Sequence, residues 1–325
     1  MGRRADAVLM RKAERLSRWG ATLVALVGMA VCASAQAENF LLPGPTVTIV
    51  GESQTIAADR RESLLDMARR NGLGFTDMRH ANPGVDMWVP ADGAPVLLPT
   101  AFVLPNAPRD GMVVNIAEYR LYFYYRQDGR DMVATFPISI GRMDWQTPLG
   151  DWKVTRKRTR PTWRPPQSII AEYAADGEAL PSVVPPGPDN PLGDYAINLS
   201  APGYLIHGTN RPRGVGMQVT HGCLRMLPED IEWLFPKVPS GLPVAIINEP
   251  VKIGWRAGRL YVEVHQPLEE PPPGYMKAQV ARLESAARAA RAELDVRSMR
   301  RALVERKGVP VPISLEIRDT RTAAR

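Results

Sequence analysis

Two histidines and a cysteine lie close together past the middle of the chain, and their spacing could support acyl transfer. Cys223 follows His221 by two residues and His207 by sixteen. A thiol becomes a strong nucleophile when a base removes its proton. Gly208 and Gly222 each follow one of the histidines and would let the backbone approach a reacting carbonyl closely. These five residues predict a cysteine-based acyl-transfer site.

The residues alone leave the identity of the base open between His207 and His221. His221 would face the same side as Cys223 on a strand, because side chains two residues apart share a face. Adjacency in sequence does not by itself give hydrogen-bond geometry, so His207 stays a candidate.

Other groups around the cysteine could stabilise a bound substrate. The backbone N–H groups of Gly222 and Cys223 are suitable oxyanion donors, and one such donor is typically worth about 10²–10³ in rate. Arg225 would bind a substrate carboxylate or brace the loop through a salt bridge. Tyr204 and Thr209 are expected to line the same cleft.

No pattern in the sequence indicates a metal or nucleotide site. The other two histidines, His80 and His265, lie in separate segments, and there is no HExxH, CxxC or paired-carboxylate motif. A glycine-rich phosphate loop is also missing from the sequence. We therefore expect an enzyme that uses no cofactor, metal or nucleotide.

The cysteine segment resembles the signature of the L,D-transpeptidases of bacterial cell walls, which have a YkuD-type catalytic domain. The resemblance lies in His207-Gly208-Thr209 followed by Thr220-His221-Gly222-Cys223-Leu224-Arg225. Similarity to the Gram-negative periplasmic branch lies in Thr147-Pro148-Leu149-Gly150, Pro161-Thr162-Trp163 and Val184-Pro185-Pro186-Gly187-Pro188. Together the resemblance covers roughly residues 43 to 315.

The resemblance implies a role for each residue of this segment. Cys223 would be the nucleophile and His207 the base, with the carbonyl of Gly208 holding the imidazole in one tautomer. His221 would order the cleft or assist the oxyanion site. Arg225 would suit the D-centre carboxylates of the family's substrates.

By the same resemblance, the protein would be a peptidoglycan L,D-transpeptidase. Its donor would be a tetrapeptide stem that Cys223 cleaves between meso-diaminopimelate and D-Ala, forming a thioester. The acceptor amine would belong to a second diaminopimelate, giving a 3-3 cross-link, or to a lysine of an outer-membrane lipoprotein. Carbapenems, which inactivate this family, would acylate Cys223. Two alternatives stay open: a hydrolase that uses the same thioester, and a non-catalytic wall-binding protein.

The N-terminus has the features of a cleaved secretory signal peptide, residues 1–37. Its apolar run, residues 21–33, leads to small residues that fit an A-x-A site, and we expect cleavage after Ala37. The run is too short to span about 30 Å of hydrocarbon, so we do not expect an integral membrane protein. Cleavage would remove Cys32 and leave Cys223 as the single cysteine of a periplasmic protein. The basic residues before the run are Arg3, Arg4, Arg11, Lys12, Arg15 and Arg18.

The net charge does not indicate nucleic-acid binding. The chain has a formal charge of +7, but residues 1–37 hold six basic and two acidic residues, so about +3 remains on the mature protein. Such a charge gives at most a weak attraction to an anionic polymer such as the cell wall.

Residues 44–100 resemble a small βααβ domain, the LysM carbohydrate-binding module. The usual opening Gly-Asp-Thr-Leu of that module is replaced by Arg61-Glu62-Ser63-Leu64, so a structural spacer is an alternative. The expected elements are a strand at 46–50, a helix at 63–70, a second helical turn or two at 78–81 and a strand at 95–99.

Residues 111–248 predict a catalytic domain that is mainly β with minor α. Short strands between Gly and Pro turns favour an antiparallel or mixed sheet over repeated βαβ units. We expect a hairpin from residues 112–116 and 120–125, and a short amphipathic helix at 228–235. The other expected strands are 132–140, 152–155 and 244–247.

Residues 156–192 form a proline-rich insertion that we call the lid segment. Its eight prolines stiffen it, and apolar residues such as Trp163, Ile169 and Tyr173 would pack, which favours a functional lid over a solvated linker. The resemblance places this region beside the substrate cleft, with Trp163 among the substrate-binding residues.

Residues 251–317 predict a C-terminal strand-plus-helix extension. We expect a strand at 259–264, one long charged helical stretch at 278–306 and an edge strand at 309–317.

Overall fold

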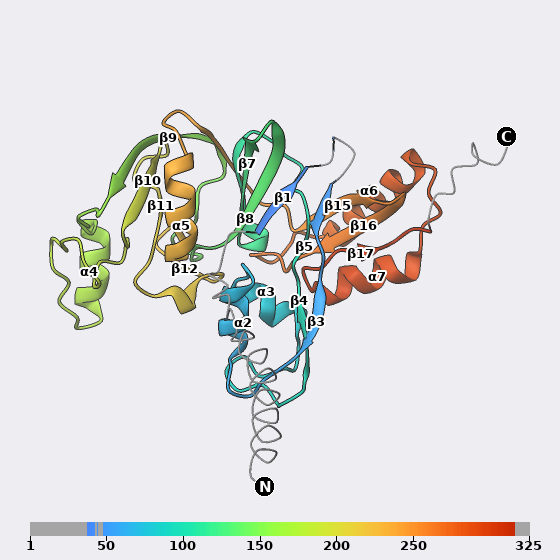
Figure 1. The fold of residues 1–325 in the computed structure, drawn as a ribbon, viewed down its shortest axis with the longest axis horizontal. Coiled ribbons are helices and arrows are strands. Elements are labelled where there is room, and N and C mark those ends of the chain that lie inside the picture. The colour runs from blue at the N-terminus through green and yellow to red at the C-terminus, as the bar shows by residue number, and fades with distance from the viewer. Residues whose placement is uncertain (1–37, 43, 45–47, 316–325) are drawn as a thin grey trace, which may run out of the picture. The chain divides into compact units, whose positions relative to one another are not determined.

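A large mixed sheet organises the computed structural model, which describes residues 38–42, 44 and 48–315 (Figure 1). The predicted signal peptide, with Cys32, lies outside the described residues. Ten strands form this sheet in the order β1-β8-β13-β11-β10-β9-β14-β6-β7, and β12 pairs with β8. A further pairing of β7 with β8 closes the path from β8 to β7 into a ring. The predicted β-rich fold with minor helices is confirmed.

Most neighbouring strands of this sheet are antiparallel, but β11–β13, β6–β14 and β8–β12 are parallel pairs. The hairpin expected near residue 118 is present, and its turn ends at Tyr119, which has a left-handed φ of 54°. The strands are β1 (Glu38–Leu41), β6 (Gly111–Asn115), β7 (Arg120–Gln127), β8 (Arg130–Gly141), β9 (Gly150–Thr159), β10 (Tyr195–Leu199), β11 (Leu205–His207), β12 (Gln218–Thr220), β13 (Leu224–Met226) and β14 (Pro243–Ile247).

Side-chain alternation along these strands builds two separate hydrophobic cores. Met112 and Val114 of β6 belong to one core, which also contains Ile231 and Leu234 of helix α5 (Pro228–Leu234). Val113, between them, points to the other face of the sheet and belongs to a second core. The remaining helices of this region are α4 (Gln167–Ala175) and the 3₁₀ turns η1 (Ile116–Glu118), η2 (Pro212–Gly214) and η3 (Phe235–Lys237).

The second core is shared between the sheet and the segment predicted to be LysM-like. Tyr122 and Tyr124 of β7 pack there with Leu64, Met67 and the rest of that segment's apolar residues. The segment has two strand pairs, β2–β5 and β3–β4, where one strand at each end was expected. Its elements are β2 (Ile49–Gly51), β3 (Gln54–Ala57), α2 (Leu64–Arg70), α3 (Phe75–Ala81), β4 (Pro95–Leu98) and β5 (Ala101–Val103).

Capping explains where the two helices of this segment begin. Ser63 caps α2, with its hydroxyl accepting from the N–H of Asp66 at 3.2 Å, and Asp66 accepts from the N–H of Ser63 in return. The second helix begins at Phe75, earlier than expected, because the Asp77 carboxylate accepts from the N–H of Gly74 at 2.8 Å.

The C-terminal extension contains two helices where one long helix over residues 278–306 was predicted, so that prediction is wrong. The chain turns after α6, where Arg291 has a left-handed φ of 53°, and Asp295 then caps α7 by accepting from the N–H of Ser298 at 3.0 Å. The break lets Leu283 of α6 and Met299 of α7 enter one buried core. The elements are β15 (Val251–Arg256), β16 (Arg259–Val264), α6 (Tyr275–Ala289), α7 (Val296–Glu305) and β17 (Val311–Pro312).

A buried ionic cluster joins this extension to the rest of the protein. The Lys252 ammonium of β15 lies 2.5 Å from Glu118 Oε2 and 2.8 Å from Glu263 Oε1, and it donates to the carbonyl of Val103 at 2.6 Å. Glu263 in turn accepts from the N–H of Val103. Residues from strand β5, from the η1 turn between two strands of the large sheet, and from the extension therefore meet at one point.

Among residues 38–42, 44 and 48–315, no helix is both long and apolar enough to cross a membrane.

Candidate active site

Two short parallel strands bring His207 and Cys223 together. Strand β11 ends at His207, and β13 begins directly after Cys223. Their register pairs Ile206 with Leu224 and His207 with Arg225. Side chains paired across parallel strands share a face, so His207 and Arg225 point to the same side of the sheet, and Cys223 lies directly before β13 in the adjacent segment.

The turn that carries the cysteine, residues 220–223, is held by hydroxyl groups, and we call it the catalytic turn. Thr220 Oγ1 donates to the carbonyl of Cys223 at 2.6 Å. Thr147 Oγ1, from the Thr-Pro-Leu-Gly run, donates to the carbonyl of Gly222 at 2.9 Å. Gly222 has a φ of +96°, and a Cβ there would lie 2.7 Å from Cε1 of Tyr204. This position therefore requires glycine.

The imidazole of His207 is buried and oriented by its own neighbour. Nδ1 lies 2.7 Å from the carbonyl oxygen of Gly208. A carbonyl can only accept, so Nδ1 carries the proton and Nε2 of the neutral ring is free to accept one. Burial, together with the charge of Arg225, lowers the pKa of His207 to about 4. The ring is therefore a neutral acceptor at pH 7.

The thiol of Cys223 is also held in its neutral form. Burial raises its pKa, although the backbone of Leu205 and the charge of Arg225 act in the opposite direction. Its Sγ lies 3.8 Å from the carbonyl oxygen of Gly203, a contact that suits a weak S–H donor. The resting pair is thus a thiol and a neutral imidazole.

His221 lies on the other side of the turn and makes a different contact. Its Nε2 lies 3.0 Å from Glu172 Oε2, and its ring meets that of Trp145 edge-on at 5.2 Å between centroids. Glu172 belongs to α4 of the lid segment, so the lid contacts the catalytic turn directly.

Arg225 has no carboxylate partner among the described residues. Its Nε is buried without a hydrogen-bond partner, and burial and the charge of Arg211 lower its pKa. A buried cation without a counter-ion is unfavourable unless a ligand supplies the anion.

A family model for the L,D-transpeptidase catalytic domain, YkuD, matches residues 109–246. The probable L,D-transpeptidase YcfS of Escherichia coli (strain K12) is 40% identical over 307 residues, which are 92% of this chain and 95% of that protein. The chain belongs to the L,D-transpeptidase family. The family predicted from the cysteine segment is thereby confirmed.

Two more relatives of this L,D-transpeptidase come from the same organism. The probable L,D-transpeptidase YbiS is 43% identical over 76% of this chain and 81% of its own length. The probable L,D-transpeptidase ErfK/SrfK is 40% identical over 86% and 91%. A solved structure, the catalytic domain of the E. faecium L,D-transpeptidase, covers 44% of this chain and 100% of its own, with 20% identity and a TM-score of 0.33.

The other predicted site residues of this L,D-transpeptidase occupy supporting positions. The ring of Tyr204 lies against Gly222, and its hydroxyl is 3.4 Å from the carbonyl of Gln146. Thr209 Oγ1 accepts from the N–H of Arg211 at 2.9 Å and so shapes the turn after His207. Trp163 lies at the base of the lid segment, where its backbone pairs with Val184.

Several residues that hold the site were missed in the sequence. Thr220 and Thr147 belong to motifs that were noted, but their hydroxyls were given no role. Arg142, which lies 2.6 Å from Glu172 Oε1, and Trp145 follow β8 and carry no local signal. Only the long-range pairing of the lid segment with this turn identifies Glu172.

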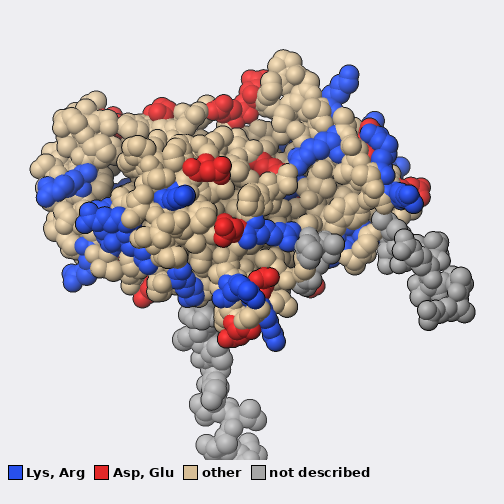
Figure 2. Space-filling view, turned by 90° about the horizontal axis from the view of Figure 1, so that it is seen from above, with Lys and Arg blue, Asp and Glu red and all other residues tan. Residues whose placement is uncertain are grey.

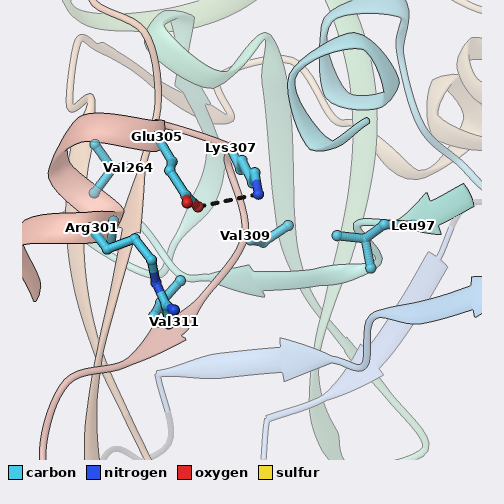
Figure 3. Close-up of a pocket in the computed structure, with 8 residues that line it drawn as sticks. Leu97, Val264, Arg301, Glu305, Lys307, Val309 and Val311 are labelled. Carbon is cyan, nitrogen blue, oxygen red and sulfur yellow. Dashed lines mark ion pairs between the residues drawn. The ribbon is translucent and has the colours of Figure 1, made fainter. Parts of the chain in front are cut away.

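A cavity of about 300 Å³ lies away from this L,D-transpeptidase site (Figure 3). It is bounded by the LysM-like segment at Leu97 and by the C-terminal extension, including an ion pair of Glu305 with Lys307 at 3.2 Å. No residue of segment 203–226 lines it, so it contributes nothing to the cysteine chemistry.

One group of three potential metal ligands lies close together among the described residues: Glu118, Glu263 and His265. The Lys252 ammonium contacts both carboxylates of this group and supplies the compensating positive charge. The cluster is therefore satisfied as an ionic network of the fold.

Proposed function

We propose that this L,D-transpeptidase is a periplasmic cysteine acyltransferase that acts on peptidoglycan stem peptides. The observation that carries the proposal is the parallel pairing of β11 with β13, which brings the segment that ends at His207 beside the segment that follows Cys223, with Nδ1 of His207 bound to the carbonyl of Gly208. Triad-type catalysis needs this combination of nucleophile, base and orienting group.

Proton transfer accompanies the attack, because both partners start neutral. Nε2 of His207 removes the thiol proton as Sγ of Cys223 attacks the carbonyl carbon between meso-diaminopimelate and D-Ala. The N–H groups of Gly222 and Cys223 receive the oxyanion, and Thr220 and Thr147 hold the turn that carries them. The imidazolium then protonates the leaving amine of D-Ala, and a thioester remains.

The second half of the reaction repeats these steps with an incoming amine. The amine attacks the thioester, His207 takes its proton, and the proton returns to sulfur as the new peptide bond forms. The acceptor is a second diaminopimelate, which gives a 3-3 cross-link, or a lysine of an outer-membrane lipoprotein. Water as acceptor would give hydrolysis with the same residues. None of these steps needs a cofactor.

Arg225 and the basic surface support an acidic substrate. The guanidinium of Arg225, which is half-buried and whose Nε has no hydrogen-bond partner, suits a carboxylate of the diaminopimelate D-centre. Figure 2 shows several Lys and Arg side chains on the side where β9 and α4 lie. Strand β9 contributes Lys153, Arg156, Lys157 and Arg158, for whose side chains no ion pair is found in the described part of the chain.

The deciding experiment measures the intact mass of the protein that begins at residue 38 after incubation with a carbapenem. We expect one stable adduct on the wild type, no adduct on Cys223→Ala and slow formation on His207→Ala. Digestion of treated sacculi would then identify the acceptor. A folded wild type without an adduct would overturn the cysteine mechanism and favour a non-catalytic wall-binding protein.

The LysM-like segment would hold the enzyme on the wall. Its loop before β4 exposes Trp88, at 55%, and Val89, at 67%, and an exposed indole suits stacking on a sugar ring. Sedimentation with purified sacculi tests this role in Cys223→Ala, which removes the chemistry. We expect Trp88→Ala in that background to reduce the sedimented fraction, whereas unchanged sedimentation would favour a structural spacer.

A further inference from the structure

Helix α4 of the lid segment reaches both sides of Cys223 through two consecutive residues. Glu172 contacts His221, which precedes the cysteine, at 3.0 Å. The neighbouring Tyr173 lies near enough to Arg225, which follows the cysteine, to act on the pKa of Arg225 in the upward direction. The helix therefore contacts the catalytic turn.

Both oxygens of the Glu172 carboxylate are in use. Oε2 accepts from His221, and Oε1 accepts from Nη2 of Arg142 at 2.6 Å. The backbone N–H of Arg142 donates to the carbonyl of Thr220 at 3.0 Å, so Arg142 is itself fixed to the catalytic turn. Hydrogen bonds from Arg142, followed by those from His221, lower the pKa of Glu172. The carboxylate is therefore anionic at neutral pH.

The base of the lid segment is fixed independently of Glu172. Asn190 is fully buried, and its Nδ2 donates to the carbonyls of Pro161 and Pro185 at 2.8 and 3.0 Å. The backbones of Trp163 and Val184 exchange two hydrogen bonds, of 2.9 and 2.8 Å. These contacts close the base of the loop that presents α4.

The helix itself has little other attachment. Ile169 is the only buried residue of α4. One apolar side chain gives modest burial energy, so the two charge-assisted hydrogen bonds of Glu172 are a large part of what keeps the helix on the turn.

We propose that Glu172 is a positioning residue that holds α4 on the catalytic turn and fixes the imidazole of His221 beside Cys223. The holding of α4 follows from the contacts alone. The effect on donor binding rests on the proposed function, because the donor peptide must bind where α4 meets the catalytic turn. The alternative is that Glu172 forms a partly exposed ion pair that affects neither the position of α4 nor donor binding, as many surface ion pairs do.

The experiment compares Glu172→Gln with Glu178→Gln. Glutamine keeps the shape of Glu172 and removes its charge. Glu178 follows α4 in the same segment, is exposed, and has no side-chain partner among the described residues. Hydrogen exchange of the α4 amides and steady-state kinetics with a tetrapeptide ending in meso-diaminopimelate–D-Ala are measured for both variants and the wild type. Equal melting temperatures confirm that each variant is folded.

We expect the α4 amides to exchange about tenfold faster in Glu172→Gln, because this variant loses charge-assisted hydrogen bonds. The expected effect is moderate because the Arg142 and Glu172 side chains are about one-third exposed. The KM for the donor should rise about five- to tenfold while kcat changes less than about threefold, since positioning is lost but the nucleophile and base remain. Glu178→Gln should match the wild type in both measurements.

A second variant, Arg142→Gln, tests whether Arg142 holds α4 through its hydrogen bond to Glu172. The double variant Glu172→Gln/Arg142→Gln should show the exchange rate of Glu172→Gln alone, because both changes remove the same contact.

Two results would overturn the proposal. One is that the exchange rate of the α4 amides and the KM for the donor are the same in Glu172→Gln as in Glu178→Gln. The other is a large fall in kcat with unchanged exchange, which would make Glu172 a catalytic residue. Failure of the wild type to form a carbapenem adduct would instead reject the proposed function, and the exchange data would still decide whether Glu172 holds α4.

Discussion

At the scale of single residues, burial sets the protonation states of the proposed nucleophile, Cys223, and the proposed base, His207. Burial raises the pKa of Cys223 and lowers that of His207 to about 4. A preformed thiolate–imidazolium pair is therefore disfavoured, and in the proposed mechanism the thiol loses its proton only as it attacks. In that mechanism the lone thiol of the described residues stays unreactive until a substrate is bound.

The first prediction concerns the pH dependence of acylation. His207 acts as a base only when neutral, so lowering the pH removes activity near its folded pKa of about 4 and not near the ordinary 6.5. We expect the second-order rate of carbapenem acylation, followed by intact mass, to stay within about threefold from pH 7 to pH 5. Tryptophan fluorescence checks that the protein stays folded. A midpoint near pH 6.5 would mean that a different, exposed histidine is the base.

The second prediction concerns Gly222, whose φ is +96° and whose added Cβ would meet Tyr204 at 2.7 Å. Gly222→Ala should displace the oxyanion donors and slow acylation by about 10²-fold or more. Gly241→Ala is the matched control, because its φ of +85° imposes similar backbone strain but its Cβ meets nothing within 4 Å. Similar acylation rates in the two variants would show that the turn tolerates a side chain.

At the scale of elements, short strands and hydroxyl contacts position the site, while one short helix buries a carboxyl group that is held in its protonated form. Asp230 lies in the first turn of α5 and is 3% exposed, and its Oδ2 has no hydrogen-bond partner. Burial, followed by the charge of Glu229, raises its pKa to about 8. The folded protein therefore holds a proton there that the unfolded chain releases above about pH 3.8.

The third prediction follows from the sign of that shift. Because folding raises the pKa of Asp230, the contribution of this side chain to stability is fully present below about pH 3.8. That contribution is lost as the pH rises to about 8. Asp230→Asn removes the ionisation, so it should stabilise the protein at pH 8, by a free energy on the order of 5 kcal/mol, and change little at pH 4. Urea unfolding at both pH values measures this. Glu229→Gln, which removes a pairing with Arg69 at 2.6 Å, should give no gain. A pH-independent effect of Asp230→Asn would contradict the titration.

At the scale of the whole described chain, three segments that look separable in the sequence share buried contacts. The LysM-like segment shares a hydrophobic core with one face of the large sheet. Lys252 of the C-terminal extension lies between Glu118 and Glu263 and also reaches Val103. Residues 251–315 therefore help to stabilise the large sheet.

The fourth prediction concerns this cluster. Lys252→Met leaves two buried carboxylates without their cation, which typically costs about 3–5 kcal/mol of unfolding free energy. Chemical unfolding measures the loss, and Glu118→Gln in the same background should restore part of it. Lys153→Met, at an exposed position of β9, is the control and should change stability by less than about 0.5 kcal/mol. Equal stabilities of the two lysine variants would show that the cluster does not join the segments.

The sequence by itself determined the family and the β-rich fold. It also predicted that the candidate site lies in the cysteine segment. Hairpin and helix boundaries at residues 111–127 and 228–234 also followed from local pattern, because turn residues and side-chain alternation are local signals. The contact of His207 with Gly208 was expected only because the cysteine segment resembles the L,D-transpeptidase family.

Only the tertiary structure decided how these pieces meet. The parallel pairing of β11 with β13, the contact of Glu172 with His221 and the position of Lys252 join residues far apart in the chain, and no local pattern encodes such pairings. The long helix predicted over residues 278–306 failed for a related reason. Its composition favours helix throughout, but burying both Leu283 and Met299 in one core requires the chain to turn between them.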